Sequence, residues 1–334
     1  MNKFQYFIIC TLVGLITSCG SQQQDKGVKK TSLEIEVEDL DHILMSATSV
    51  KDVENILENH PEMIRYYFSD FEGDKPALSG QLFQITQNPD FQAFSLQVDS
   101  IIGNRKNEIL EPLAQAFGAI HNQFPSFKSP RVIFIKTGFL GNDLYVSDSL
   151  VVIGLDYFGG PQATFRPNVF DYQLRRYHKE NIVPAILYYI AESYNKQNPR
   201  EQSLLDDMIG IGKSFEFVKQ IMPSCPDSII IGYSADNLRR AYNSQQDIWA
   251  FMINNKLLYE KNTLVKEKYI GERPIVAEMG PEIPGGIGRW IGWRIVNKYV
   301  SEHPEITLSE LMAQSDANKI LQEARYKGEK DEEE

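Results

Sequence analysis

One β-rich stretch constrains the fold of this chain more than any other feature. Residues 131–161 read RVIFIKTGFLGNDLYVSDSLVVIGLDYFGGP and are dense in β-branched and aromatic residues punctuated by glycine. This composition is typical of short strands. We expect strands at Arg131–Lys136, Leu144–Val146 and Val151–Leu155, forming a small antiparallel sheet within residues 131–158.

On both sides of this stretch, apolar residues recur at helical spacing. Ile109, Leu113, Phe117 and Ile120, for example, lie on one stripe of a helix predicted over Phe94–Phe124. Other helices are predicted at Leu40–Ala47, Val50–Tyr67, Ile182–Tyr194, Leu204–Ile221, Ala235–Tyr242, Gln245–Tyr259, Gly288–Val300 and Leu308–Tyr326. The predicted fold class is therefore α+β: a single, mostly helical domain over residues 34–326, helical in 34–128 and 181–326, with one sheet mid-chain.

Helix starts carry some local signals. Ser244 with Asp247, and Thr307 with Glu310, have the spacing of capping boxes. Asn181 is expected to be the N-cap of the helix that follows it. The state of Leu82–Gln87 is left open, because Asn-Pro closes this short apolar-polar stretch.

The N-terminus has the pattern of an export signal. Lys3 gives a positive start, and the apolar run Tyr6–Ile16 is too short to span a bilayer. The run ends in Ile-Thr-Ser before Cys19, which is typical of a bacterial lipoprotein signal in which the cysteine thiol takes up a diacylglyceryl group. We expect a signal peptide over 1–18, and a lipidated N-terminus with a flexible tether over 19–33. An ordinary secretory signal with a chance cysteine is the alternative.

Composition limits the partners and the way the fold is held together. Acyl chains such as palmitate on Cys19 would hold the chain on a membrane, and Cys225 would then be the only cysteine left, so no intrachain disulfide is expected. The net charge of −11 argues against nucleic-acid partners. Residues 327–334, KGEKDEEE, predict an acidic disordered tail. The absence of an acidic cluster directly after Cys19 favours a periplasm-facing protein on the cell membrane or the outer membrane.

The segment Asp206–Phe217, DDMIGIGKSFEF, ends like a phosphate-binding loop at Gly212-Lys213-Ser214. The full motif needs an earlier glycine where Asp207 stands, and a preceding strand where a helix is predicted. We therefore expect no nucleotide. The adjacent carboxylates of Asp206 and Asp207 are interpreted as first-turn residues that favour a helix N-terminus.

The histidine spacing argues against a metal site. No two of the histidines are four residues apart, so no helix can present the paired imidazoles of HExxH; the five are His42, His60, His121, His178 and His303. The run His178-Lys179-Glu180 has the H-x-E of zinc deaminases without the P-C-x-x-C partner. We expect no cofactor, while a hydrolase with an unconventional site built from His178, Glu180 and Glu192 stays open as the alternative.

The aromatic residues of the predicted helices are interpreted as core. Trp290 belongs to a segment, GIGRWIGWRIVNKYV, in which Gly288 and Gly292 form G-x-x-x-G. Because the segment also carries charged residues, the motif predicts close packing of helices in a globular core and no membrane dimer.

Six segments, in this order after the lipoprotein signal, resemble the gliding motility lipoprotein GldB family of Bacteroidota. They are ILENHPEMIRYYF, DSLVVIGLDYFGGP, YHKENIVPAILYYIAESY, LLDDMIGIGKSFEFVKQIMP, IGYSADNLRRAYNSQQDIWAFMINNKLLY and PGGIGRWIGWRIVNKYV. The resemblance covers Ile35 to Tyr326. It implies a cell-envelope lipoprotein required for gliding and linked to the phylum's outer-membrane protein secretion, with other gliding and secretion envelope proteins as partners.

The C-terminal half of that family is similar to predicted zinc metallopeptidases, in which one helix carries HExxH and a second supplies a glutamate before a glycine. Here Ile182–Ile190 contains neither His nor Glu, and Ile211 stands before Gly212. The resemblance therefore implies a degenerate zincin-like fold and a non-catalytic pseudo-peptidase. Its candidate groove or partner contacts are His178, Glu180, Glu192, Gly212 and Trp290. A third option is a carrier that holds an extended peptide along an edge strand at Val151–Leu155.

Overall fold

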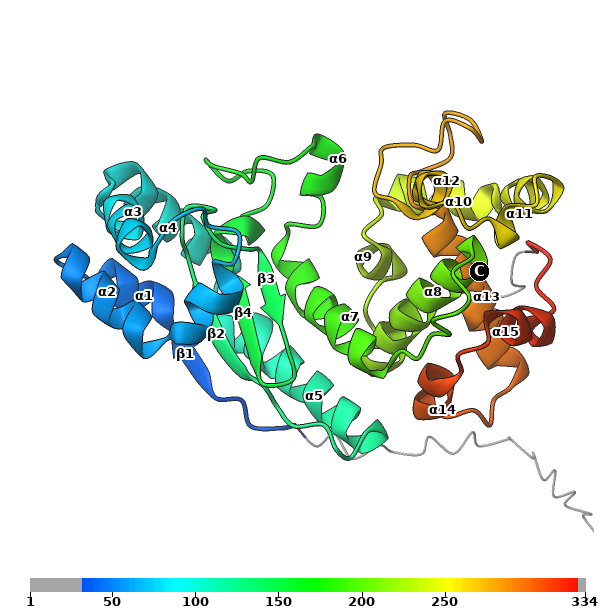
Figure 1. Cartoon of the computed structure of the whole chain (residues 1–334), viewed down its shortest axis with the longest axis horizontal. Coiled ribbons are helices and arrows are strands. Elements are labelled where there is room, and N and C mark those ends of the chain that lie inside the picture. Colours follow the sequence, from blue (N-terminus) through cyan, green and yellow to red (C-terminus); the bar gives the residue numbers. More distant parts are fainter. Residues whose placement is uncertain (1–31, 330–334) are drawn as a thin grey trace, which may run out of the picture. The chain divides into compact units, whose positions relative to one another are not determined.

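A mixed sheet of four strands lies in the N-terminal half of the fold, with strand order β1-β2-β4-β3 (Figure 1). The strands are β1 (Val37–Asp39), β2 (Arg131–Ile135), β3 (Leu144–Val146) and β4 (Leu150–Gly154). Strands β1, β2 and β4 run parallel, and β3 pairs antiparallel with β4 at one edge. The structure is a computed structural model that describes residues 32–329. The predicted signal peptide, Cys19, nearly all of the tether and residues 330–334 lie outside that range.

The prediction of an antiparallel sheet is wrong in two respects. Strands β2 and β4 are parallel, with Ile133 opposite Val152, and β1 joins the sheet from the N-terminal region. The edge-strand assignment of Val151–Leu155 is wrong as well, because β4 lies between β2 and β3. Both β2 and β4 are unbroken apolar runs buried on both faces, which is the pattern of parallel strands covered on two sides. The α+β class itself, mostly helical with one small sheet, is confirmed.

Most of the chain is helical, and the helix bounds are as follows. They are α1 (Leu40–Met45), α2 (Val50–Asn59), α3 (Lys75–Gln87), α4 (Pro89–Ile102), α5 (Glu111–Gln123), α6 (Asp171–Leu174), α7 (Ile182–Tyr194), α8 (Leu204–Ile221), α9 (Asp227–Ile231), α10 (Ala235–Asn243), α11 (Gln245–Asn254), α12 (Thr263–Ile270), α13 (Ile287–Glu302), α14 (Leu308–Ala313) and α15 (Ala317–Ala324). None of these described helices is long and apolar enough to cross a bilayer.

Helices α7 and α8 have the predicted bounds, whereas longer predicted helices are divided by local backbone geometry. The helix predicted over Phe94–Phe124 breaks at Gly103, whose φ of 75° is in the left-handed region. The helix predicted over Gln245–Tyr259 ends before Lys256, which has φ 55°. Residues Leu82–Gln87, whose state the sequence left open, form the end of α3.

The helix caps test four of the sequence signals. Thr307 and Glu310 form the predicted capping box, whereas Ser244 makes no side-chain cap and that prediction is wrong. Ser203 and Asp206 form a capping box at the start of α8, so the interpretation of Asp206 as a first-turn residue is confirmed. Asn181 occupies the N-cap position of α7 without a side-chain hydrogen bond.

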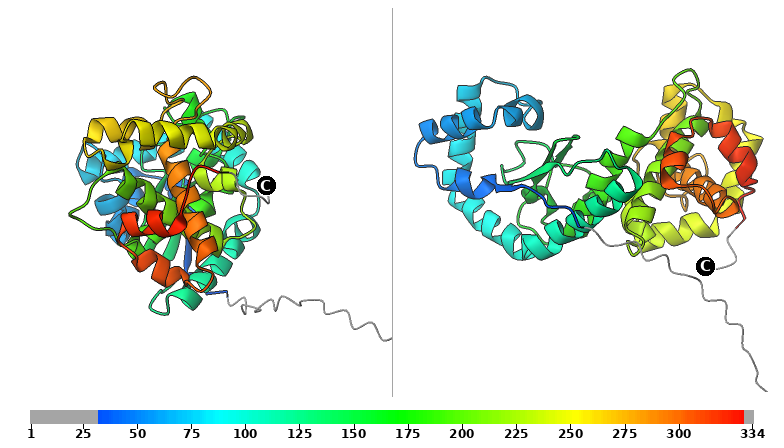
Figure 2. Two further views of the ribbon diagram at one scale, coloured as in Figure 1. Left: turned by 90° about the vertical axis from the view of Figure 1, so that its right-hand side faces the viewer. Right: turned by 90° about the horizontal axis from the view of Figure 1, so that it is seen from below.

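Alternate residues of the strands face two separate cores. Ile133 and Val152 pack with residues of α1, α2 and α3, whereas Val132, Phe134 and Val151 pack with the larger core that includes α5, α7, α8 and α13. The larger core continues from the sheet into the helical C-terminal half, and its central contact is between α8, yellow-green, and α13, orange (labelled in Figure 1 and seen again in Figure 2).

The start of the predicted tail is packed against α11. The Gln245 side chain donates to the carbonyl oxygen of Glu329 at 2.7 Å. Gly328 is buried, and a Cβ there would lie 2.7 Å from Cβ of Trp249. Contacts to the fold therefore continue to the last described residue.

Candidate functional site

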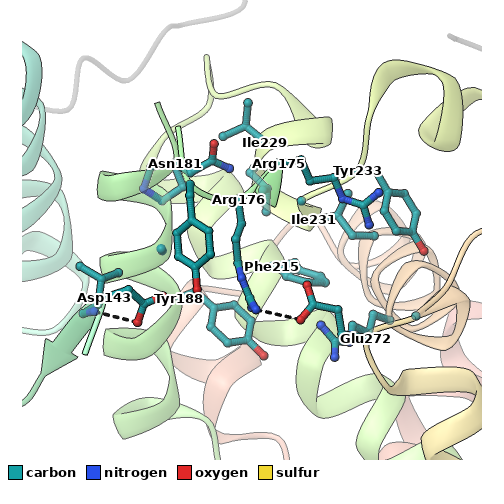
Figure 3. A pocket seen from close by; sticks show the side chains of 18 of the residues that line it. Asp143, Arg175, Arg176, Asn181, Tyr188, Phe215, Ile229, Ile231, Tyr233 and Glu272 are labelled. Atoms are coloured by element: carbon teal, nitrogen blue, oxygen red, sulfur yellow. Dashed lines mark hydrogen bonds and ion pairs between the residues drawn. The ribbon is translucent and has the colours of Figure 1, made fainter. Parts of the chain in front are cut away.

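A cavity of about 220 Å³ lies beside the edge strand β3, where α7 packs against the sheet (Figure 3). Its lining comes from the start of β3, from α7, from Phe215 of α8, from α9, from the residues that follow α6 and from the loop that precedes α13. Segments that are far apart in the sequence thus meet at one place, and they bring apolar, aromatic and charged side chains together.

Helix α7 presents the face that carries Pro184, Ala185, Tyr188 and Tyr189 to the cavity. These residues are at i, i+1, i+4 and i+5, so they lie on one side of the helix. Most other residues of α7 are apolar and lie buried between the sheet and α8, which fixes how the helix is turned, while Glu192 and Ser193 near its end are exposed. The ring of Tyr188 lies 5.4 Å from the ring of Phe215, centroid to centroid. Apolar and aromatic groups therefore form this wall.

Four arginines give the cavity its charge. They are Arg175, Arg176, Arg273 and Arg289, and they face two carboxylates, Asp143 and Glu272. The lining is therefore net positive in a chain whose net charge is −11. Such a local excess of positive charge attracts anions.

The guanidinium groups are held in different ways. Arg176 forms an ion pair with Glu272 at 3.0 Å, while Arg175 lies over the ring of Tyr233 at 5.7 Å (Figure 3). Arg289, in the first turn of α13, donates to the carbonyl oxygen of Ile270. Burial lowers the pKa of Arg175, and the group stays charged at neutral pH because a guanidinium does not lose its proton in proteins.

Glu272 joins two segments of the lining. Its carboxylate accepts from Gln173 at 3.0 Å in addition to pairing with Arg176, and its carbonyl oxygen accepts from the hydroxyl of Tyr172 at 3.2 Å. The α6 segment is thereby tied to the loop that leads into α13. This connection places Arg175 and Arg289 at the same cavity.

Two polar atoms in the lining are buried and have no hydrogen-bond partner among residues 32–329. They are Oδ1 of Asn181, an acceptor, and Nε of Arg176, a donor. Buried polar atoms of native proteins are nearly always paired. An unpaired donor and an unpaired acceptor in one cavity are the groups that a bound polar ligand would satisfy.

The tyrosines of the lining are neutral at physiological pH. Burial raises the pKa of Tyr188 to about 12, and Glu192 adds to this effect. Burial also raises the pKa of Tyr177 to about 12, and the neighbouring Asp143 adds to it. These hydroxyls can therefore donate and accept hydrogen bonds without ionising.

The residues predicted from the sequence lie elsewhere. His178 is half-buried, Glu180 and Glu192 are exposed, and none of the three lines the cavity. Burial raises the pKa of Glu192. Gly212 is buried where α8 meets α13, and Trp290, 1% exposed, lines a separate hollow of about 410 Å³. Their roles as partner contacts stay predictions.

Sequence reasoning did not find the residues that do line the cavity. On α8 the lining residue is Phe215, one helical turn after Ile211. The consecutive pair Arg175-Arg176 was the available signal, but a pair of arginines in a loop is usually solvated.

The phosphate-loop-like run lies within helix α8, as predicted. Lys213 is 1% exposed, and its Nζ donates to the carbonyl oxygens of Lys196 and Gln314 at 2.7 Å each and of Met312 at 3.3 Å. All three ammonium protons are used, so Lys213 joins the start of the segment after α7 to the end of α14. Its function is structural.

Within residues 32–329, one group of three side chains could hold a metal ion: Asp39, Asp41 and His42. It lies at the end of β1, away from the cavity. Arg105 pairs with Asp41 at 2.7 Å, and Lys136 pairs with Asp41 at 3.1 Å. The two cations already satisfy this carboxylate, which makes the cluster a poor site for another cation.

Fold and cavity together define a mostly helical α+β protein with a basic, tyrosine-lined cavity at a sheet edge. The chain belongs to the family of the gliding motility protein GldB, whose family model matches residues 21–328. It is thus a gliding motility protein of a lipoprotein family, located at the cell envelope and anchored to a membrane. Comparison with curated proteins and with solved structures gave no match.

Proposed function

We propose that this protein is a non-catalytic binding and assembly component of the gliding machinery and of the protein secretion associated with it. Acyl chains on Cys19 hold it on the cell membrane or the outer membrane, and the body faces the periplasm. Its partners are other envelope proteins of the same machinery. Neither a nucleotide nor a nucleic acid takes part.

The face of α7 that lines the cavity is the main support for a role without catalysis. Pro184, Ala185 and Tyr188 have the i, i+1, i+4 spacing of the histidine, glutamate and histidine of HExxH. A peptidase of that kind uses this face to hold zinc and to activate water. Proline, alanine and a protonated tyrosine supply neither of the two imidazoles and no general base.

The rest of the lining supports the same proposal. Phe215 is the contribution of α8 to the cavity, and Ile211, one helical turn before it, stands where the resemblance places a metal-binding glutamate. The arginines of the cavity would also repel a divalent cation, because the lining carries four positive and two negative side chains. A degenerate zincin-like fold, with its metal centre replaced by aromatic and basic groups, accounts for both features.

Metal and activity measurements on the full lipoprotein in detergent test this proposal. We expect far less than one zinc per chain by elemental analysis and no cleavage of denatured casein or of a mixed peptide pool. Stoichiometric zinc that is lost together with a peptidase activity on chelation would instead establish the alternative, a membrane-anchored metal-dependent peptidase or other hydrolase with an unconventional site.

A second experiment tests the assembly role in cells. Photo-crosslinkers placed at Tyr189, which is exposed at the cavity, are compared with crosslinkers at Leu96, which is more exposed and lies on α4, outside the cavity lining. We expect specific adducts with gliding or secretion envelope proteins from Tyr189 alone. The same adducts from both positions, or none, would contradict a partner site at the cavity.

A further inference from the structure

The cavity has the groups needed to bind a carboxylate. Arg175 and Arg289 form no ion pair with a carboxylate in the part of the chain that the structure describes. Both line the cavity together with Tyr233, whose ring lies 5.7 Å from the guanidinium of Arg175 and whose hydroxyl donates to the carbonyl oxygen of Gly285 at 2.8 Å. Arginine is the side chain best suited to a planar carboxylate, which it holds through paired N–H donors.

Two more features of the same cavity favour an anion. Nε of Arg176 is a buried donor without an acceptor, although another nitrogen of the same guanidinium pairs with Glu272. The first turn of α13 also reaches the cavity through Gly286 and Arg289, and a helix N-terminus carries partial positive charge. The helix terminus alone is not evidence of an anion site, but its partial positive charge adds to the positive electrostatic potential of the arginines.

The edge strand β3 supplies groups that suit a peptide. The carbonyl oxygen of Asp143 accepts from Gly154 of β4, and the N–H of Ser147 donates to Leu150, so the peptide groups of Leu144 and Val146 point to the free edge. The N–H of Leu144 is bonded to Oδ1 of Asp143 at 2.8 Å, which leaves the carbonyl oxygen of Leu144 and both groups of Val146 for a paired chain. Leu144 also lines the cavity. An extended chain that pairs with this edge would be directed into the cavity. The unpaired Oδ1 of Asn181 is then available to a backbone N–H of that chain.

The remaining walls identify which part of a peptide fits. Phe215, Ile229 and Ile231 offer an apolar surface, which suits a hydrophobic side chain next to the carboxylate. Asp143 and Glu272 in the lining would repel a doubly charged phosphate more strongly than a singly charged carboxylate. Peptide backbone, apolar side chain and one negative charge occur together at the C-terminus of a protein chain.

We propose that the cavity binds the free C-terminal carboxylate of an extended, apolar-ended partner segment. Arg175 and Arg289 hold the carboxylate, β3 pairs with the preceding residues, and the walls of α8 and α9 receive the last side chain. This inference rests on the proposed function: it names the ligand of a cavity that is proposed to bind partners and not to catalyse a reaction.

A peptide-retention assay tests it with the full lipoprotein in detergent and chelator. The probe is a pool of N-acetylated octapeptides, degenerate at the last three positions, prepared once as free acids and once as C-terminal amides. Peptides that co-elute with the protein are identified by mass spectrometry. We expect free acids with an apolar last residue to be retained at least about tenfold over their amides, because a charge-assisted pair is lost in the amide.

Variants assign the effect to the cavity. Arg175→Gln and Arg289→Gln should each lower retention of the free acids about 10- to 100-fold. Arg239→Gln is the matched control, because Arg239 is exposed on α10, pairs with Asp236 and does not line this cavity. Thermal unfolding of each variant shows whether it is folded. If an arginine variant does not fold, the comparison of free acids with amides on the unaltered protein still tests whether a carboxylate is bound.

Each remaining outcome has a definite meaning. Equal retention of acids and amides, or unchanged retention by a folded Arg175→Gln variant, would overturn the carboxylate site. If C-terminal amides that contain an aspartate bind as well as free acids, the site recognises a side-chain carboxylate. That result would overturn the proposal that it binds a C-terminus. Shortened peptides in the eluate would refute the non-catalytic role, whereas intact peptides without any preference would refute only this inference.

Discussion

Gly212 of α8 and Gly292 of α13 lie backbone against backbone: a Cβ built on Gly212 would be 2.5 Å from the carbonyl carbon of Gly292. A Cβ on Gly292 would overlap the carbonyl oxygen of Met208. The two helices approach this closely only because neither residue has a side chain. Their contact is the largest one between helices in the C-terminal half, and it positions Phe215 and the first turn of α13 at the cavity.

We therefore predict that Gly292→Ala lowers the free energy of unfolding by about 2–3 kcal/mol, because the helices must separate to make room for a methyl group. Urea unfolding of the full lipoprotein in detergent measures this. Gly80→Ala is the control: Gly80 is inside α3, with nothing within 4 Å of its added Cβ, and should be neutral or slightly stabilising. Equal effects at the two positions would contradict the close contact.

Lys213 gives a prediction about pH. Burial lowers its pKa to about 8 from an ordinary value of 10.5. Between pH 8 and 10.5 the unfolded chain thus binds more protons at this site than the folded chain, so the contribution of Lys213 to stability rises with pH across this window, by up to about 3 kcal/mol. Below pH 8 both states are protonated and the contribution is flat.

Comparison with Lys213→Met isolates this group from the many tyrosines that also titrate at high pH. The difference in unfolding free energy between the two proteins, measured by urea unfolding at a series of pH values, should increase above pH 8. A difference that is constant from pH 7 to 10.5 would show that the lysine keeps its ordinary pKa when buried.

His178→Ala should leave gliding intact, since His178 is outside the cavity and no chemistry is assigned to it. Colony spreading, with immunoblotting for protein level, measures the effect. His60→Ala is the contrasting variant: the ring of His60 bonds to Glu38 at 2.8 Å and to the carbonyl oxygen of Ile56 at 2.7 Å, so its loss should reduce stability. Loss of gliding by His178→Ala at normal protein level would point to hidden chemistry.

Cys19→Ala should release the protein from the membrane and abolish gliding, because acyl chains on this cysteine are the proposed anchor. Fractionation of cells into soluble and membrane material, followed by a spreading assay, checks both effects. Cys225→Ala is the control, since this buried thiol lies in the folded body and has no part in anchoring. Normal membrane association of the Cys19 variant would require another anchor.

The sequence was most informative where each local signal agreed with the fold. Helices α7 and α8 were predicted with the observed bounds, because long apolar patterns and clear terminal residues define them. The parallel arrangement was missed even though β2 and β4 are unbroken apolar runs. Strand β1, read as VED, is short and largely exposed, so it carries no pattern that predicts a strand.

The cavity was beyond local reasoning for a different reason. Arg175, Tyr233 and Arg289 are far apart in the sequence and come together only through tertiary contacts such as the bonds of Glu272. Each of these residues, taken alone, has an ordinary sequence context. Periodicity and motif spacing describe neighbours along a chain, and this site is made of residues that are not neighbours.

Strand β1 is at one edge of the sheet, and β3, beside the cavity, is at the other. The chain enters the fold at Leu33, which donates to the carbonyl oxygen of Ala114, and then at Glu36, which accepts from Val132. Mechanical tension applied through the residues before them would load these bonds and the β1–β2 ladder first. Two further strands separate that load from the cavity, so tension on the membrane anchor would reach the proposed binding cavity only after these bonds.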